Sequence, residues 1–345
     1  MQGDPSRDSL SRPELAVIAS VVEDDLRQVE RLLRERVKSV AVVIPEVGDH
    51  SFGSGGKRIR PLVVLLCSRM CGYRGPRASL VASAAEMLHT ATLMHDDVVD
   101  GAATRRGRES VNARFGDRIA ILVGDFLLAR ASQTLLEDGN PDIMWAFTST
   151  IGIMSEGEVL QITRSFDPEI PESVYLEIIG RKTSSLLASS AEAGAILGDV
   201  TRAERNAVRE YGWQLGLAFQ LVDDALDYVG TRAELGKTPL ADLGEGKVTL
   251  PLLVALKRCT TSEREMVQGS LKQFAKLSAA GERDPDRDDV SRILELVTHY
   301  GGTEVTYERA HACASRACAE IAPFADCEAK RALQDLAEFT VARRT

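Results

Sequence analysis

Two groups of aspartates in this 345-residue chain share one spacing, with members at positions i, i+1 and i+4. The groups are Asp96, Asp97 and Asp100, and then Asp223, Asp224 and Asp227. On a helix the i and i+4 members lie on one face, about 6 Å apart, so their carboxylates can share divalent cations. Without a cation these carboxylates would repel each other and destabilise the helix. The spacing therefore predicts two groups of metal-binding carboxylates.

Both aspartate groups follow apolar helical runs, ATLM at 91–94 and AFQLV at 218–222. An isolated carboxylate at the end of a buried run costs free energy. Mg²⁺ is a suitable partner because it binds a few carboxylates together with waters and substrate phosphates. The alternative is that each group caps a helix end that faces solvent. The same spacing after two apolar helices favours the metal site.

Basic residues lie close to the first aspartate group. The segment GSGGKRIRP (53–61) is a glycine-rich turn that leads into a helix. Its backbone N–H groups and the side chains of Lys57, Arg58 and Arg60 can bind phosphate oxygens. Arg105 and Arg106 come just after the aspartates, and arginine forks match the geometry of phosphate. These residues predict a site for an anionic substrate.

Further basic residues lie near the second aspartate group. Arg181, Lys182 and Thr183 interrupt an otherwise apolar helix, and Lys237 and Lys247 flank the segment that follows the second group. A lone basic pair is usually a solvated surface feature. The position of these residues beside the carboxylates favours a role in binding a second anion.

Two histidines accompany the first aspartate group. His89 lies two turns before Asp96, where its ring could donate a hydrogen bond to a diphosphate or could be satisfied inside the core. His95 is adjacent to Asp96, and the sequence leaves it as a structural or supporting residue.

The composition and the pattern of the chain predict an all-α fold. Hydrophobic residues make up 44% of the chain and aromatic residues 5%, and the abundant Ala and Leu favour helices over strands. Short turns with Gly, Pro, Asn and Asp separate long apolar helical stretches, and alternating strand patterns are nearly absent. No linker divides the chain, so we expect a polar leader at 1–10 and a single helical domain over 11–345.

The charge and the cysteines bear on location and partners. The formal net charge of −9 argues against a general nucleic-acid-binding protein. No run of about 18 apolar residues predicts a membrane span, and the polar start lacks the pattern of a signal peptide. The six cysteines form no C-x-x-C pair and fit no standard zinc spacing, so we expect reduced thiols in the cytoplasm.

Together these motifs resemble those of the trans-isoprenyl diphosphate synthases, and within them the bacterial octaprenyl-type polyprenyl synthases. The resemblance runs from about Gly55 to the C-terminus. Its motifs occur in the order of the family: GGKRIRP, HTATLMHDDVVD with RRG, GDFLLARA, EGEVLQI, RKTSSL, FQLVDDALDY and EGKVTLPL.

The resemblance implies long antiparallel helices around a deep central cavity, usually in a homodimer. It also implies three Mg²⁺ ions between the two aspartate groups, which hold the diphosphate of an allylic substrate. The residues that would bind isopentenyl diphosphate are Lys57, Arg60, His89 and Arg106. The residues that would contact the allylic diphosphate are Arg105, Lys182, Thr183, Gln220 and Lys237.

The implied reaction is an alkyl transfer that begins with ionisation. Metal ions and basic groups would stabilise the departing diphosphate, and apolar walls would keep water from the allylic cation. The double bond of isopentenyl diphosphate then attacks the cation, and a proton is lost. No side chain stands out as the base, and the resemblance implies that the released diphosphate takes the proton.

One position departs from the pattern of the family. The loop after the second aspartate group usually reads Gly-Lys-x-x-Gly-x-Asp-Leu, whereas Leu240 stands here at the second Gly. This difference bears on how the loop closes over the site and leaves the class of reaction unchanged.

The helix that carries the first aspartate group also predicts the length of the product. Ala91 and Met87 precede Asp96 at about one turn per step, and Ala129 and Ser132 are small residues on a neighbouring helix. A prenyl chain that grows along this face would meet no bulky side chain at position 91, although ordinary packing alanines would look the same. With the resemblance, this pattern predicts a long product, octaprenyl diphosphate or a close neighbour.

Three other functions are compatible with parts of the pattern. A synthase with a shorter product, of geranylgeranyl or farnesyl length, would share the diphosphate-binding motifs. A class I terpene cyclase also ionises an allylic diphosphate, but it replaces the second aspartate group and does not need GGKRIRP. A non-catalytic helical subunit of a synthase would be expected to lose some of the aspartates or arginines, which are all present here.

Overall fold

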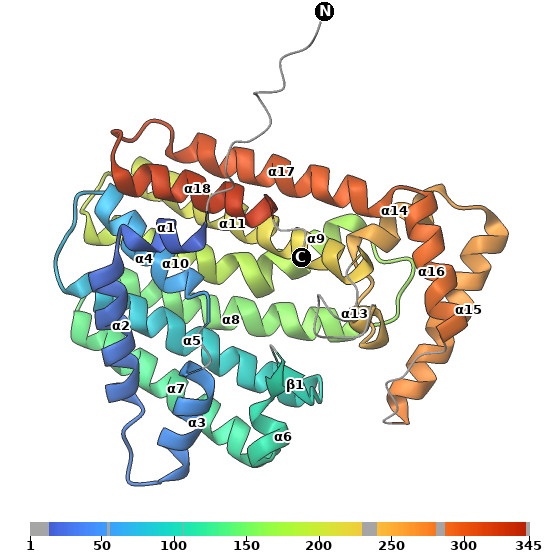
Figure 1. The fold of residues 1–345 in the computed structure, drawn as a ribbon, viewed down its shortest axis with the longest axis horizontal. Coiled ribbons are helices and arrows are strands. Elements are labelled where there is room, and N and C mark those ends of the chain that lie inside the picture. Colours follow the sequence, from blue (N-terminus) through green and yellow to red (C-terminus); the bar gives the residue numbers. More distant parts are fainter. Residues whose placement is uncertain (1–13, 54–55, 106, 230–239, 281–286, 343–345) are drawn as a thin grey trace, which may run out of the picture.

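The computed structural model describes residues 14–53, 56–105, 107–229, 240–280 and 287–342 (Figure 1). Within these ranges the chain is almost wholly helical, and its strands are one short antiparallel pair, β1 (Thr104–Arg105) and β2 (Arg108–Glu109). The prediction of an all-α fold is confirmed. The predicted leader at 1–10 lies outside the described residues, and the first helix begins at Leu15.

The helices follow one another through short turns. Those of the first half are α1 (Leu15–Ser20), α2 (Glu23–Arg36), α3 (Val43–Phe52), α4 (Ile59–Met70), α5 (Arg77–Val99), α6 (Val111–Phe115), α7 (Asp117–Asp138) and α8 (Pro141–Thr163). Those of the second half are α9 (Glu172–Ile179), the π-helical turn η1 (Gly180–Ser184), α10 (Ser185–Leu197), α11 (Arg202–Val229), α13 (Ala241–Gly244), α14 (Leu250–Arg258), α15 (Thr261–Ala279), α16 (Arg287–His299), α17 (Gly302–Ile321) and α18 (Glu328–Ala342).

Helices α10 and α11 form the centre of the molecule. Helix α10 packs against α4, α8 and α11, and α17 covers α11 along much of its length (Figure 1). A Cβ atom on Gly194 of α10 would lie 2.7 Å from Cβ of Cys67 in α4, so only glycine permits this approach. A cluster of buried apolar residues extends from Ile18 to Val341, which supports a single domain.

Turn residues end the helices at several of the breaks that the sequence indicates. Asn140 accepts hydrogen bonds from two backbone N–H groups at the start of α8, where Pro141 is the first residue. Gly139 ends α7 in the left-handed conformation, with φ of 78°. Thr260 and Glu263 form a capping box at the start of α15.

Two of the longest helices end at the aspartate groups. Helix α5 ends at Val99, with Asp100 as its C-terminal cap, and α11 ends at Val229, two residues after Asp227. The C-terminal end of a helix carries a partial negative charge, which disfavours carboxylates unless a cation lies close by. The fold therefore places both groups where positive charge is needed.

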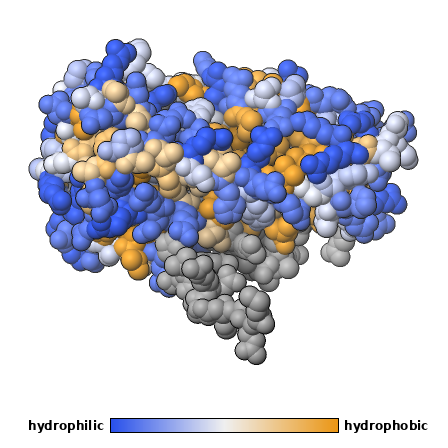
Figure 2. Space-filling model, turned by 90° about the horizontal axis from the view of Figure 1, so that it is seen from above, coloured by the Kyte–Doolittle hydropathy of each residue, from blue (hydrophilic) through white to orange (hydrophobic). Residues whose placement is uncertain are grey.

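The surface in Figure 2 is mostly hydrophilic, with smaller groups of apolar residues between polar side chains. Among the described helices, only α7 is long and apolar enough to cross a membrane. It packs along α5, and core helices of water-soluble proteins have the same length and composition. The six cysteines are free thiols.

Candidate active site

A cavity of about 710 Å³ opens between α4, α5, α8, η1, α11 and the segment 242–249. Apolar side chains form part of its wall, including Leu93, Met154, Ile179 and Phe219. Most of the residues predicted to bind substrate or metal also line it: Lys57, Arg60, His89, Asp96, Asp100, Arg105, Lys182, Thr183, Gln220, Asp223 and Asp224. Arg106 and Lys237, the other predicted ligands of diphosphate, lie outside the described residues.

Asp96 and Asp100 reach the cavity from the end of α5. Burial raises the pKa of Asp96 to about 6, and the carboxylates of Glu158 and Asp100 add to this rise. The ammonium group of Lys182, across the cavity, acts in the opposite direction. Negative charge on Asp96 therefore needs a cation close by.

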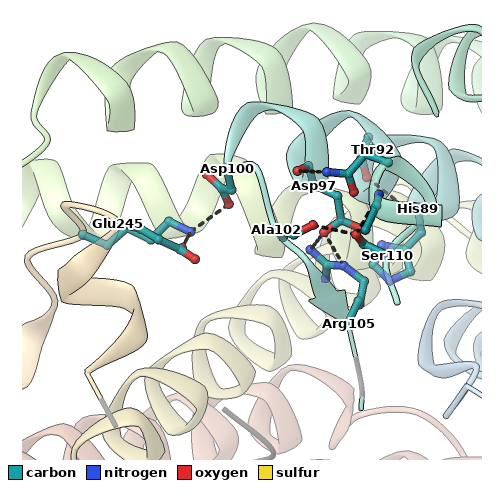
Figure 3. A network of polar contacts seen from close by, with 11 residues as sticks. His89, Thr92, Asp97, Asp100, Ala102, Arg105, Ser110 and Glu245 are labelled. Atoms are coloured by element: carbon teal, nitrogen blue, oxygen red, sulfur yellow. Dashed lines mark hydrogen bonds and ion pairs between the residues drawn. The ribbon is translucent and has the colours of Figure 1, made fainter. Parts of the chain in front are cut away.

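Lys247 places positive charge beside the first aspartate group. Its Nζ donates a hydrogen bond of 3.0 Å to Asp100 and another of 2.6 Å to Glu245 (Figure 3). Burial lowers the pKa of Lys247, but the carboxylates of Glu245, Asp242 and Asp100 outweigh burial and raise it. The contact with Asp100 joins the end of α5 to the segment that follows α13.

The middle member of the first group, Asp97, lies on a different face of α5. It is 2% exposed and lines a smaller cavity of about 70 Å³. Its Oδ1 accepts hydrogen bonds from Arg105, at 2.7 Å from Nε and 2.6 Å from Nη2 (Figure 3). The Asn112 amide donates to its backbone carbonyl at 3.2 Å. Asp97 thus orients Arg105, which itself lines the main cavity.

The middle member of the second group, Asp224, is also 2% exposed. Its Oδ2 accepts a hydrogen bond of 2.5 Å from the Tyr175 hydroxyl, and its Oδ1 accepts one of 2.8 Å from the Gln220 amide. Burial raises the pKa of Asp224 to about 7, Asp242 and Asp223 add to the rise, and the two hydrogen bonds oppose it. Both oxygens of Asp224 therefore have protein donors.

A chain of hydrogen bonds connects Asp224 to the η1 turn. The Thr183 hydroxyl donates to Oε1 of Gln220 at 2.7 Å, and the Gln220 amide donates in turn to Asp224. Thr183 lies in the π-helical turn, a distortion that is frequent at functional sites. The two residues predicted to contact the allylic diphosphate are thus in direct contact with each other.

The last member of the second group, Asp227, holds the segment after α11. It is 1% exposed, its Oδ2 accepts a hydrogen bond of 3.3 Å from the backbone N–H of Asp242, and its carbonyl accepts one of 3.1 Å from Leu240. Leu240 adopts the left-handed conformation, with φ of 57° and ψ of 29°. The glycine of the family pattern would adopt this conformation without strain, which explains the family's residue at the position where this chain has Leu.

The basic residues around η1 divide between the cavity and the outside. Lys182 lines the cavity and forms an ion pair with Glu158 of α8. Arg181 instead pairs with Glu156 and with Glu177, at 2.8 Å from the latter. Consecutive residues therefore have different roles, and only Lys182 lies at the site.

Three site residues were not assigned a role from the sequence: Tyr175, Asp242 and Lys247. Tyr175 lies within an apolar stretch of α9 and has no local motif, so its contact with Asp224 depends on the fold alone. Asp242 is the Asp of the loop pattern in which Leu240 replaces Gly, and it lines the cavity. That pattern was the signal that could have identified Asp242.

The residues predicted to limit product length do not lie on the cavity wall. Ala91 and Met87 are fully buried in the core beneath it, each with 0% exposure. Ala129 is exposed on α7, and the Ser132 hydroxyl bonds to the carbonyl of Leu128 in the same helix. Helix α7 is apolar on all sides, so its periodicity could not indicate which side faces the core.

The donor set suits Mg²⁺ bound together with a diphosphate. Among the described residues, no three His, Cys, Asp or Glu side chains converge into a complete metal site. Asp96 and Asp100 on one wall and Asp223 on the other supply carboxylate oxygens. Mg²⁺ takes one or two carboxylates and completes its shell with waters and substrate phosphates, so an incomplete set of protein ligands is what such a site requires.

Comparison with known proteins agrees with this geometry. The family described as polyprenyl synthetase matches residues 42–282. Octaprenyl diphosphate synthase from Escherichia coli (strain K12) is 36% identical over 329 residues, which cover 95% of this chain and 99% of that protein. The chain therefore belongs to the polyprenyl synthetase family.

Solved structures of the family share the fold. Polyprenyl synthase from Caulobacter crescentus CB15, complexed with calcium and isoprenyl diphosphate, matches with a TM-score of 0.90 and 38% identity, over 98% of this chain and 100% of that chain. Decaprenyl diphosphate synthase from Rhodobacter capsulatus matches with a TM-score of 0.89 and 35% identity, over 96% and 100%. This protein is accordingly a prenyltransferase of the polyprenyl diphosphate synthase type.

Proposed function

We propose that this chain elongates an allylic diphosphate with successive molecules of isopentenyl diphosphate, to a product of octaprenyl length or close to it. One observation carries the proposal: carboxylates of α5 and α11 share a cavity with the basic and polar groups of the GGKRIRP turn and η1. Two anionic substrates and their counter-ions need this combination of charges.

The carboxylates that would hold Mg²⁺ are Asp96, Asp100 and Asp223, which line the cavity. Asp97, Asp224 and Asp227 belong to the same groups and would support them. Bound Mg²⁺ would neutralise charge on the departing diphosphate and so favour its departure. Three ions per site is the number we propose, as the resemblance implies.

The chain's own residues would hold and orient both substrates. Lys182, Thr183, Gln220 and Arg105 would bind the allylic diphosphate, with Lys237. Lys57, Arg60, His89 and Arg106 would bind isopentenyl diphosphate so that its double bond faces the ionising carbon. The apolar wall around Met154 and Phe219 would exclude water from the cation. The departing diphosphate would accept the proton, because no side chain of the wall is assigned as a base.

A long product is supported by the apolar part of the cavity and by the relatives. The Escherichia coli relative is named for an octaprenyl product and the Rhodobacter capsulatus structure for a decaprenyl product. A geranylgeranyl diphosphate synthase from Saccharolobus solfataricus is 33% identical over 90% of this chain, so a shorter product is the second candidate. Ala91 and Met87 are proposed to yield to a growing chain, which would have to displace packed core beside α5.

We also propose a cytoplasmic homodimer. The outer faces of the neighbouring helices α7 and α8 expose Leu122, Leu136 and Trp145, with 63%, 65% and 73% of each residue exposed. Large apolar side chains grouped on a surface mark interfaces between proteins. Sedimentation velocity of the purified chain would test this assembly.

Turnover by the purified chain alone tests the proposed function. The chain is incubated with Mg²⁺, an allylic primer and radiolabelled isopentenyl diphosphate, and the extracted products are separated by length. The expected result is label in prenyl products of about forty carbons. Loss of diphosphate without incorporation of label would indicate a cyclase, and no reaction unless a second subunit is added would indicate a non-catalytic partner.

A further inference from the structure

Arg58 is the residue of the GGKRIRP turn with an unusual backbone. It precedes the first residue of α4 and adopts φ of 49° and ψ of 37°, the left-handed region that side chains other than glycine rarely occupy. Its neighbours Lys57 and Arg60 line the main cavity, whereas Arg58 lines the smaller cavity beside it. A strained residue persists only where its surroundings determine its conformation.

The contacts of the Arg58 side chain supply that determination. Its guanidinium bonds to Glu30 of α2 at 2.6 Å and to Glu86 of α5 at 2.8 Å. It also donates to the carbonyl of Phe52, the last residue of α3, at 2.7 Å. The Arg58 side chain is 12% exposed and that of Glu86 only 7%, so this ion pair is largely shielded from water. One side chain thus joins the turn to three helices.

The contact with Glu86 has a direct relation to the site. Glu86 and His89 are three residues apart on α5, and therefore lie on one side of that helix. His89 lines the main cavity together with Lys57 and Arg60. The Arg58–Glu86 pair consequently ties the turn that carries two of these groups to the helix that carries the third.

We propose that Arg58 is a positioning residue for the site of isopentenyl diphosphate: it fixes Lys57 and Arg60 of the turn relative to His89 of α5. This inference rests on the proposed function, which assigns those three residues to that substrate. Arg58 itself faces away from the substrate, and its guanidinium is engaged by Glu30 and Glu86. Displacement of charged ligands by even 1 Å weakens a site that depends on their joint geometry.

Two variants separate the ion pair from the backbone strain. In Arg58→Gly the left-handed conformation is relaxed while the guanidinium is lost. In Glu86→Gln the backbone and the guanidinium stay, and the charge of the partner on α5 is removed. The matched control is Arg69→Gln, in the last turn of the same helix α4. Arg69 is also partly buried, at 24% exposure of its side chain, and pairs with Asp25 of α2 at 2.7 Å.

Equilibrium binding of isopentenyl diphosphate, without primer, and steady-state kinetics with both substrates are measured for each variant. We expect Arg58→Gly and Glu86→Gln to weaken binding and to raise KM for isopentenyl diphosphate by about tenfold or more, with KM for the primer changed less than about twofold. Arg69→Gln should lower Tm and leave both KM values unchanged. Equal changes in both KM values, or normal binding by both variants, would overturn the inference.

Lys57→Ala shows which of the two hypotheses has failed. If Lys57→Ala weakens the binding of isopentenyl diphosphate and the two Arg58–Glu86 variants do not, the inference is wrong and the proposed function stands. If Lys57→Ala leaves this binding unchanged, the assignment of the substrate to the turn is wrong, and the inference fails with it.

Discussion

Asp96 and Asp223 hold the first position of their groups, and both face the cavity. Their loss should remove the carboxylates that hold Mg²⁺ on the diphosphate. We expect Asp96→Ala and Asp223→Ala each to lower kcat about 10²- to 10³-fold and to retain the helical fold, because a repelling carboxylate is removed. The measurements are turnover in saturating Mg²⁺ and circular dichroism. Asp125→Ala on α7, at an exposed carboxylate outside the cavity, is the control, and near-normal turnover in either site variant contradicts the assignment.

Tyr175 is the residue whose role only the fold reveals. Its hydroxyl donates to Asp224, which orients Gln220 and through it Thr183. Tyr175→Phe should therefore raise KM for the allylic substrate about fivefold to tenfold and leave KM for isopentenyl diphosphate unchanged, since one charged hydrogen bond is lost. Kinetics with each substrate varied in turn will measure this difference.

The control for Tyr175→Phe is a tyrosine with the same burial elsewhere. Tyr211 is fully buried on α11 and donates a hydrogen bond of 2.8 Å to the carbonyl of Leu333. Tyr211→Phe should cost about 1 kcal/mol of the free energy of unfolding and change neither KM. If both variants alter KM for the allylic substrate alike, general loosening and not orientation of Asp224 explains the effect.

The raised pKa of Asp96 predicts how the stability of the metal-free protein depends on pH. The folded state holds the proton up to about pH 6, whereas an unfolded aspartate releases it near 4. The stabilisation is therefore complete below pH 4 and is lost as pH rises through 6. Asp96→Asn should gain on the order of 2 kcal/mol relative to the natural chain between pH 5 and pH 8. Urea unfolding with a chelator present measures this gain, and a constant difference across that range contradicts it.

The spacing of the aspartates predicted much of the site at the level of single residues. Apolar runs before Asp96 and Asp223 placed both groups at the ends of buried helices, and the structure brings both ends to one cavity. The spacing also contained a distinction that was not used. The i+1 position lies about 100° around a helix from position i, so Asp97 and Asp224 could not face the same way as their neighbours. Which donors they meet instead depended on the fold.

At the scale of elements, the segment from Leu240 to Lys247 depends on one strained residue. Leu240 is left-handed and 1% exposed, so its side chain contributes burial while its backbone opposes it. Leu240→Ala keeps the strain and loses the side chain, whereas Leu240→Gly loses both. We expect Gly at this position to be more stable than Ala by about 1 kcal/mol, the reverse of the usual order.

Thermal and urea unfolding of the two Leu240 variants will decide the order. Leu243 is the internal control because it is also 1% exposed and lies in the short helix α13, where its backbone is helical. At that position Gly should be less stable than Ala by about 1 kcal/mol. If Gly is the less stable residue at both positions, the left-handed backbone of Leu240 does not carry the strain.

Helix η1 shows why some elements could not be predicted. The run RKTSSL reads as an ordinary helical stretch, and nothing in its residue types indicates a π-helical turn. The turn changes the register of the helix by one residue, so Arg181 pairs with Glu156 and Glu177 while Lys182 and Thr183 line the cavity. Such a bulge is determined by contacts across the fold, including Trp213 of α11, which lies 2.8 Å from a Cβ built on Gly180.

At the scale of the whole molecule, product length depends on how far the core beside α5 can open. Leu93 and His89 line the cavity, and Ala91 lies on the same helix with 0% exposure, packed in the core. A product of octaprenyl length has to extend beyond the cavity, and small side chains in its path make displacement easier than large ones. Ala91→Phe should therefore shorten the product sharply, because a ring added to a packed wall cannot be absorbed without strain.

The same substitution farther from the site separates a blocked path from a strained core. Ala82 is also fully buried on α5, more than two turns farther from the aspartates, so Ala82→Phe should lower Tm to a similar degree and leave the product unchanged. Products labelled from isopentenyl diphosphate are separated by length for the natural chain and both variants. Equal products from all three would show that the chain grows along another route, and a shift in Ala82→Phe as well would show that overpacking of α5 alone changes length. Shorter products from Ala91→Phe alone would place the path of the growing chain beside Ala91.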